Sequence, residues 1–235
     1  MTAPHVAVAI TAWDAERFVA DAIRSALDQT VPPSAVVVVD DGSTDATARI
    51  AGGIDERVRV ISCPHRGIGV SRNAALAAIA DGSAPDFVAF LDADDLWLPR
   101  KLELQLDAFA REPQLDAAFC LVDEFDDFGE QPAVATRAPR TGQPAIITSA
   151  VLVRSALLGR VGPFPTGAVG DWVDWWARAR GLGAREHVVG EVLVRRRIHG
   201  RNNSALRSDG GRTFLGAARR HLHARRAQSG PGDGK

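Results

Sequence analysis

Three aspartates, Asp92, Asp94 and Asp95, follow an apolar run of strand length at residues 87–92. Carboxylates this crowded resist ionising together unless a cation or hydrogen-bond donors compensate their charge. Asp92 and Asp94 are two positions apart, so in an extended or turning segment their side chains point the same way. One or two carboxylates with substrate phosphates commonly hold Mg²⁺. The group therefore predicts a metal and phosphate site, and an acidic turn that caps the next helix is the alternative interpretation.

The segments around these aspartates alternate between apolar runs of strand length and stretches with helical spacing. Strands are expected at 6–11, 35–40, 58–62, 87–92 and 117–122, and helices at 14–29, 43–51, 67–80 and 99–111. Helices between apolar strands imply parallel pairing, with helices on both faces of the sheet. Ligands of such sheets bind beyond the carboxyl ends of the strands. Because the run 35–40 also ends in carboxylates, Asp40 and Asp41 are expected at the same edge as Asp92.

The second half of the chain has a different pattern. A loop is expected at 123–144, a short strand running into a helix at 145–158, a helix at 171–183 and one or two strands at 186–200. Trp172, Trp175 and Trp176 have helical spacing typical of core residues, and Trp172 as a wall of the sugar site is the alternative. The chain is thus divided into an α/β half at 1–122, a second half of the same domain at 123–204 and a basic helical tail at 205–235.

Composition narrows the class of protein. Hydrophobic residues make up 46% and charged residues 24% of 235, which is ordinary for a soluble globular protein. The net charge of −1 gives no reason to expect nucleic acid as a partner. Cys63 and Cys120 have no zinc or disulfide spacing. The start of the chain lacks a signal-peptide pattern and no run is long enough to span a bilayer, so a cytoplasmic protein is expected.

Four stretches together resemble the family 2 glycosyltransferases with a GT-A fold. They are VAVAITAWDAERFVADAIRSALDQT, VVVVDDGSTDAT, GIGVSRNAAL and FVAFLDADDLWLPRKLELQ, in that order. The resemblance is dense over residues 5–122 and thinner to about 204. It implies an α/β fold of GT-A type: a mostly parallel, Rossmann-like sheet with helices on both faces and a smaller acceptor-side half.

The resemblance also implies a nucleotide-sugar site. Its residues here would be Thr11, Ala12, Asp40, Asp41, Arg72, Asp92 and Ala93. Thr11 and Ala12 would border the base, and Asp40, with Asp41, would accept from the base or contact the ribose. Arg72 would help hold the nucleotide. Asp92 would bind the ribose or a metal-bound water.

The implied metal ligands are Asp94 and His199, the latter in the segment RRRIHGRNNS. The implied catalytic base is Asp171, at a place where the family often has Glu-Asp and this chain has Gly170-Asp171. A plain helix N-cap is the alternative role for Asp171, and Asp174 is a weaker candidate for the base. Because Gly170 replaces the glutamate, the resemblance assigns no residue here to the contact that this glutamate makes in the family.

These roles imply a metal-dependent, inverting transfer of a sugar from a nucleotide-diphosphate sugar, with Mn²⁺ or Mg²⁺ as cofactor. A UDP-sugar is the expected donor. The acceptor hydroxyl or thiol could belong to a polysaccharide, a lipid-linked sugar, a peptide or a small molecule. A glycosyltransferase-like nucleotide binder without turnover is one alternative. A nucleotidyltransferase is another, although the first strand lacks the glycine-rich loop typical of that class.

The basic tail has three interpretations. It could pack on the domain, contact anionic lipid headgroups at the inner face of the membrane, or mediate self-association. A homodimer could also complete the acceptor site, because the second half is short.

Overall fold

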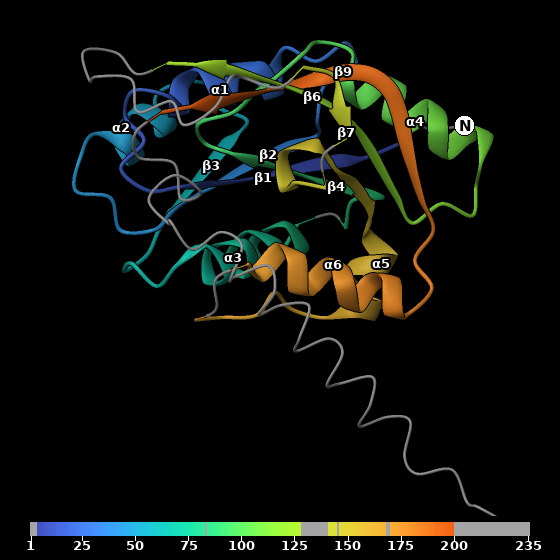
Figure 1. The fold of residues 1–235 in the computed structure, drawn as a ribbon. Coiled ribbons are helices and arrows are strands. Elements are labelled where there is room, and N and C mark those ends of the chain that lie inside the picture. Colours follow the sequence, from blue (N-terminus) through green and yellow to red (C-terminus); the bar gives the residue numbers. More distant parts are fainter. Residues whose placement is uncertain (1–3, 83, 128–140, 145, 168–169, 200–235) are drawn as a thin grey trace, which may run out of the picture.

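The computed structural model describes residues 4–82, 84–127, 141–144, 146–167 and 170–199 (Figure 1). In chain order, the elements are β1 Val6–Ala12, α1 Val19–Leu27, β2 Ala35–Asp40, α2 Thr47–Gly52, β3 Val58–Ser62, α3 Ile68–Ala80, β4 Phe87–Asp92, β5 Leu96–Trp97, α4 Lys101–Arg111, β6 Ala117–Asp126, β7 Gln143–Pro144, the 3-10 turn η1 Thr148–Ala150, β8 Leu152–Arg154, α5 Ser155–Val161, α6 Asp171–Gly181 and β9 Glu186–Ile198. The basic tail predicted at 205–235 lies outside the described residues.

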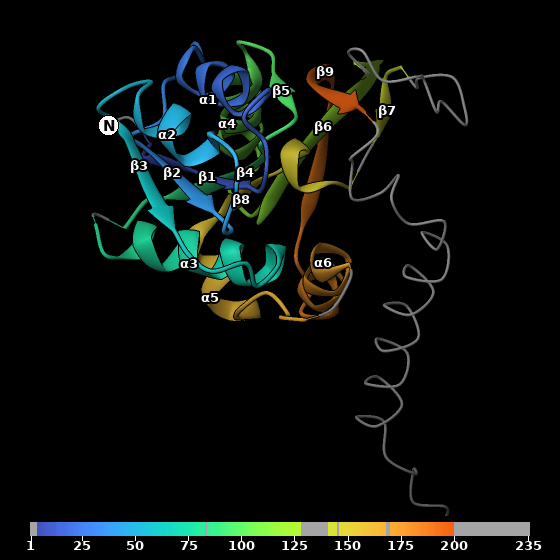
Figure 2. The ribbon, with the colours of Figure 1, turned by 90° about the vertical axis from the view of Figure 1, so that its left-hand side faces the viewer.

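The strands form one sheet in the order β3-β2-β1-β4-β8-β6-β9-β5, with β7 paired to β6. The neighbours β3, β2, β1 and β4 are parallel, as are β6 and β9, whereas β8 lies antiparallel between β4 and β6. Helices α1, α2 and α4 lie on one side of the sheet and α3, α5 and α6 on the other (Figures 1 and 2). The expected α/β architecture, a mostly parallel sheet between helices, is confirmed.

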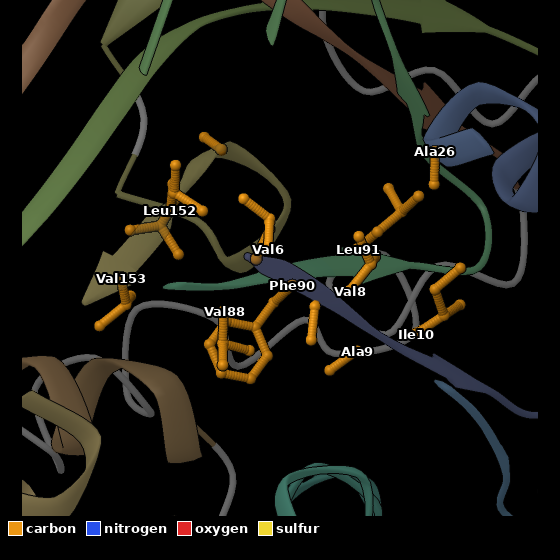
Figure 3. Close-up of a cluster of buried hydrophobic side chains, with 14 of the residues drawn as sticks. Val6, Val8, Ala9, Ile10, Ala26, Val88, Phe90, Leu91, Leu152 and Val153 are labelled. Atoms are coloured by element: carbon orange, nitrogen blue, oxygen red, sulfur yellow. The ribbon is translucent and has the colours of Figure 1, made fainter. Parts of the chain in front are cut away.

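The central strands are continuous apolar runs because helices cover both of their faces. Residues Val6 to Ile10 of β1 are all buried, as are Phe87 to Leu91 of β4 (Figure 3). Helix α1 turns the face Val19, Ala22, Ile23, Ala26 and Leu27 to this core, which is the spacing of an amphipathic helix. Burial of this surface is the main source of stability that the described fold offers.

Helix α1 begins at Val19, so the prediction of a helix from residue 14 was wrong by five positions. Asp14 has a backbone φ of 46°. The N–H of Asp14 donates to Ser43 Oγ at 2.9 Å, and the N–H of Ala15 donates to Thr47 Oγ1 at 2.8 Å. These contacts hold the segment after β1 as a loop against the start of α2.

The loop predicted from residue 123 is also corrected, because β6 continues to Asp126. The acidic residues at its end pair in register with the basic end of β9, for example Glu124 with Arg196. The Glu124 Oε1 and Arg196 Nη1 atoms are 3.2 Å apart. Opposite charges on adjacent strands therefore stabilise a segment whose composition alone resembles a loop.

Within the described ranges, none of the helices combines the length and the apolar character that crossing a membrane requires. The three tryptophans of α6 are buried and stack on one another. Trp172 is bound through its Nε1 to the carbonyl of Ile146 at 3.0 Å. The expected core role therefore describes them better than a wall of the sugar site.

Candidate active site

The predicted binding edge is formed where β2, β1 and β4 end side by side. Ala12 pairs in register with Asp40 and Thr11 pairs with Asp92. The carbonyl of Thr11 accepts from the N–H of Ala93 at 3.3 Å, and that of Ala12 accepts from the N–H of Asp41 at 2.8 Å. The two acidic strand ends thus flank the end of β1, as the alternation of strands and helices predicted.

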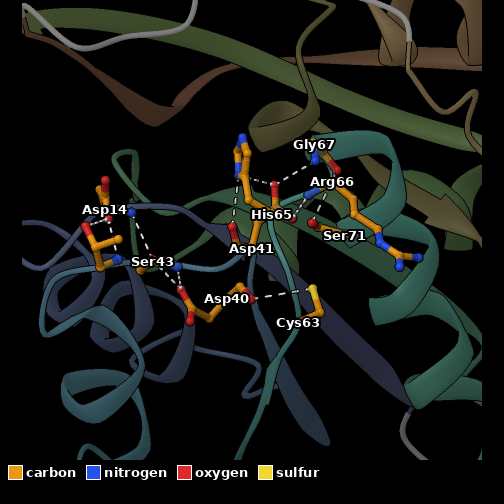
Figure 4. A network of polar contacts seen from close by, with 10 residues as sticks. Asp14, Asp40, Asp41, Ser43, Cys63, His65, Arg66, Gly67 and Ser71 are labelled. Atoms are coloured by element: carbon orange, nitrogen blue, oxygen red, sulfur yellow. Dashed lines mark hydrogen bonds and ion pairs between the residues drawn. The ribbon is translucent and has the colours of Figure 1, made fainter.

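The carboxylates of Asp40 and Asp41 face different partners (Figure 4). Asp40 Oδ1 accepts from the backbone N–H of Ser43 at 3.3 Å and from the Ser43 hydroxyl. Asp41 accepts from the N–H groups of Arg66 and Gly67, each at 2.9 Å. Asp41 therefore fixes the loop that leads into α3. Its contact with a nucleotide base, and that of Asp40, stay predictions.

His65, in the same loop, forms an aromatic stack with Trp13, which follows the end of β1. Trp13, 48% exposed, stacks on His65 with ring centroids 4.5 Å apart. The Nδ1 of His65 is 2.9 Å from the carbonyl oxygen of Asp41. Gly42 has a φ of 73°, and a Cβ there would lie 2.6 Å from the backbone nitrogen of His65. Only glycine suits this position, because it needs both the left-handed backbone and the close approach.

Arg72 is buried at the centre of the site and joins two candidate residues. Its Nη1 lies 2.5 Å from Oδ2 of Asp171, and its Nη2 lies 3.1 Å from Oδ1 of Asp92. Nη2 also donates to Thr148 Oγ1 at 3.1 Å. Burial alone would lower the pKa of the Arg72 guanidinium, but the carboxylates of Asp92 and Asp171 raise it above its usual value. A further contact of Arg72 with the nucleotide stays a prediction.

The pKa of Asp92 depends on burial and on two charged neighbours. Burial raises its pKa, the charge of Arg72 opposes that rise, and the charge of Asp94 adds to it. The Thr148 hydroxyl donates to Asp92 Oδ2 at 3.2 Å, and the backbone N–H of Asp92 donates to Ser149 Oγ at 3.2 Å. The turn η1 therefore supports the end of β4 through both hydroxyl groups.

Asp94 and His199 meet although they are far apart in the chain. Asp94 Oδ2 lies 3.1 Å from His199 Nε2, and the imidazole packs against Phe18 at 4.7 Å between ring centroids. Two neighbouring ligands, each about 2.1 Å from an octahedral ion, are about 3 Å apart. The pair therefore has the spacing of two ligands of a Mn²⁺ or Mg²⁺ ion, which is also the spacing of the direct contact between the two side chains. Over the described ranges no cluster of three or more histidine, cysteine or acidic side chains is placed to hold a metal.

Asp171 begins α6 and is 4% exposed. The N-cap position belongs to Gly170, which has φ 82° and ψ 32°, and no side chain caps the helix. The Asp171 carboxylate instead turns to Arg72, so the alternative of a plain N-cap is wrong. The left-handed backbone at Gly170 also explains why a glycine, and not a glutamate, stands before Asp171.

Asp95 was expected in the acidic turn, but Ser149 and Arg197, which support it, and the neighbouring Thr148 were not predicted. Asp95 is buried, accepts from Ser149 Oγ at 2.6 Å and accepts from the backbone N–H of Arg197 at 3.2 Å. Burial, with the charges of Asp94 and Asp92, raises its pKa well above the usual range. Thr148 and Ser149 carried no periodic or motif signal, since they stand in a short polar turn.

Comparison with known proteins identifies the family. The family described as "Glycosyl transferase family 2" matches residues 7–154. The chain is 41% identical over 108 residues to TuaG of Bacillus subtilis (strain 168), a glycosyltransferase assigned to teichuronic acid biosynthesis, covering 44% of this chain and 41% of TuaG. It is 29% identical over 225 residues to the uncharacterized glycosyltransferase alr2836 of Nostoc sp. (strain PCC 7120 / SAG 25.82 / UTEX 2576), covering 84% of this chain and 66% of that protein. The chain thus spans less than two thirds of either relative.

Solved structures agree on the fold. The crystal structure of S. aureus TarS 1-349 in complex with UDP-GlcNAc has a TM-score of 0.72 and 21% identity, covering 92% of this chain and 65% of that one. The mannosyltransferase PcManGT from Pyrobaculum calidifontis, in complex with GDP-Man and Mn²⁺, has a TM-score of 0.72 and 19% identity, covering 100% and 66%. The fold is that of the GT-A glycosyltransferases. This chain belongs to glycosyl transferase family 2.

Proposed function

We propose that this chain transfers a sugar from a nucleotide-diphosphate sugar to an acceptor hydroxyl or thiol, with inversion and with the help of a divalent ion. The observation that carries the proposal is the position of Arg72, which connects the strand-end carboxylate Asp92 to the candidate base Asp171. Family membership supports it, because the matched residues 7–154 contain the whole strand-end edge.

The donor would lie along the ends of β1, β2 and β4. Thr11 and Ala12 border the base site, and Asp40 and Asp41 contact the base or ribose. Arg72 helps to hold the nucleotide, and Asp92, next to Ala93, binds the ribose or a metal-bound water. Proteins of the same fold bind UDP-GlcNAc and GDP-Man, which supports a nucleotide-sugar donor. A UDP-sugar remains the expected choice.

Asp94 and His199 would hold Mn²⁺ or Mg²⁺. Such an ion, when bound, neutralises the charge that develops on a leaving diphosphate. The Mn²⁺ in the PcManGT complex supports this cofactor. The 3.1 Å separation of the Asp94 and His199 atoms supports their assignment as neighbouring ligands.

Asp171 would accept the proton of the attacking hydroxyl at its carboxylate. Arg72 orients this carboxylate, because a guanidinium presents donors in a rigid plane. A single displacement with one base predicts inversion at the anomeric carbon. Burial of Asp171 keeps bulk water from its carboxylate, which favours transfer over hydrolysis.

The proposed acceptor belongs to a polysaccharide, a lipid-linked sugar, a peptide or a small molecule. A homodimer and a peripheral contact with the membrane stay predictions, and the basic residues that suggested the membrane contact lie outside the described part of the chain.

The direct test is turnover. Purified protein is incubated with Mn²⁺ and a panel of UDP-, GDP- and TDP-sugars, with and without simple sugar and lipid-linked acceptors, and release of the nucleoside diphosphate is measured. We expect release with one nucleotide class, stimulated by an acceptor and lost in Asp171→Asn. Tight nucleotide binding with no release from any donor and acceptor would instead support the binding protein without turnover.

A further inference from the structure

Arg197 lies on β9, two positions before His199, and is 6% exposed. Its Nε donates to the backbone carbonyl of Asp94 at 3.1 Å. Its backbone N–H donates to Oδ1 of Asp95 at 3.2 Å. One residue thereby holds the turn after β4 through both its side chain and its main chain.

The guanidinium of Arg197 is itself held on several sides. It lies 4.8 Å from the ring centroid of Phe18 and 4.9 Å from that of Phe125. It forms an ion pair with Asp127 at the end of β6 and lies 3.8 Å from Oδ2 of Asp21 on α1. A planar cation stacked on aromatic rings and paired with carboxylates has little freedom to move.

The Phe18 ring links Arg197 to the second candidate ligand. The Phe18 ring also contacts the imidazole of His199, with ring centroids 4.7 Å apart. Arg197 thus touches the backbone of Asp94 directly and reaches His199 through Phe18 and through the strand that both residues share. Both residues whose atoms lie 3.1 Å apart, Asp94 and His199, are therefore in contact with Arg197 or with the ring that it packs against.

We propose that Arg197 is a positioning residue that fixes Asp94 and His199 as a pair for the divalent ion. The inference rests on the proposed function, because it concerns the metal of the same site. Residues that orient metal ligands determine affinity, and their loss typically weakens metal binding by about 10–100-fold.

The test compares Mn²⁺ affinities of purified variants, measured by the electron paramagnetic resonance signal of free Mn²⁺ in the presence of saturating UDP. Arg197→Met keeps the length of the side chain but removes its donors, and Arg197→Lys keeps the charge without the planar fork. Arg195→Met is the matched control, because Arg195 is exposed on the same strand and its guanidinium also lies over Phe125, at 4.4 Å.

We expect Arg197→Met to weaken Mn²⁺ binding by about 10–100-fold, with Arg197→Lys intermediate and Arg195→Met unchanged. Binding of UDP without metal should be the same in all four proteins, and high Mn²⁺ should restore the kcat of Arg197→Met. A general loss of structure would weaken metal-free UDP binding too, and saturating Mn²⁺ would not restore kcat.

Should Arg197→Met fail to fold, Arg197→Lys and Asp127→Asn carry the test, the latter by releasing one partner of the guanidinium. Mn²⁺ affinity indistinguishable from that of the wild type in every folded variant overturns the inference while leaving the proposed function intact. Failure of the wild type to bind Mn²⁺ with any nucleotide overturns the proposed function and the inference with it.

Discussion

Arg72 Nη1 lies 2.5 Å from Oδ2 of Asp171, although 99 positions of the chain separate the two residues. The same guanidinium also bonds Asp92, so the end of β4 and the start of α6 are connected through one buried cation. This arrangement fixes the candidate base relative to the proposed donor edge. Such fixed geometry is how an enzyme turns a two-body encounter into an aligned one.

Replacing the candidate base should abolish turnover without abolishing donor binding. We expect Asp171→Asn to lower kcat by about 100- to 10,000-fold, because a positioned general base contributes that much. The KM for the donor should change little, since the strand-end residues proposed to bind the donor are unchanged. Asp174→Asn is the control. Asp174 lies one turn further along α6 and 3.5 Å from Arg178, and we expect it to retain activity. Equal losses in both variants would contradict the assignment of the base.

Two glycine-to-alanine changes in helices should have opposite effects on stability. A Cβ at Gly69 in α3 would lie 2.2 Å from the carbonyl oxygen of Pro165, whereas one at Gly159 in α5 would meet nothing within 4 Å. Alanine ordinarily stabilises a helix interior by about 0.5–1 kcal/mol relative to glycine. Gly159→Ala should therefore raise the free energy of unfolding by about that amount.

Gly69→Ala should lower the free energy of unfolding, because the backbone of the 164–165 loop has to move. Asn73 binds this loop through both backbone groups of Phe164, at 2.8 and 2.9 Å. Urea unfolding of the two variants and the wild type measures both signs. A stabilised Gly69→Ala protein would show that α3 and the loop are not in the close contact described.

The buried amine of Lys101 predicts a pH-dependent stability. Burial lowers its pKa from 10.5 to about 8. The ammonium has a hydrogen bond to Gln105 Oε1 at 2.8 Å and lies 4.0 Å from the Trp97 ring centroid. Below about pH 8 the amine is charged in both folded and unfolded chains, and the folded state bears the full desolvation penalty.

As the pH rises from about 8 toward 10.5, the folded chain releases this proton before the unfolded chain does, so the lysine destabilises the fold less. Relative to the wild type, Lys101→Met should therefore raise the free energy of unfolding most near pH 7. This gain should shrink by up to about 3 kcal/mol by pH 10. The comparison is made between pH 7 and 10 on both proteins, because burial also raises the pKa of Cys120 to about 11 and adds an opposite trend, which the charge of Lys101 reduces in the wild type. A difference that is constant from pH 7 to 10 would contradict the lowered pKa.

The strand-end edge could be predicted from the sequence because its cause is local. Apolar runs that stop at Asp40 and Asp92, separated by helices, require parallel strands whose ends coincide. The observed register, Ala12 with Asp40 and Thr11 with Asp92, follows from that pattern.

Contacts between distant segments were beyond the same reasoning. Arg72 was assigned to the nucleotide, and nothing in its helix indicated that its guanidinium would reach Asp171. Thr148 and Ser149 act through their contacts with Asp92 at the end of β4, and their segment leads directly into β8, which pairs with that strand. The acidic end of β6 needed its basic partner on β9 to be recognised as a strand. Asp94 was indicated by the acidic cluster itself, its pairing with His199 as a metal ligand came from the family resemblance, and their 3.1 Å contact required the structure.

Nucleotide binding by thermal shift tests the donor site most directly. UDP, GDP and TDP are each added with and without Mn²⁺ to the wild type and to Asp94→Asn. A ligand at 100 times its Kd stabilises the folded state by about 2.7 kcal/mol, which raises the Tm measurably. We predict a rise in Tm with one nucleotide class, UDP being expected, that is greatest with Mn²⁺ and loses its metal-dependent part in Asp94→Asn. No rise with any nucleotide, with or without Mn²⁺, would contradict it.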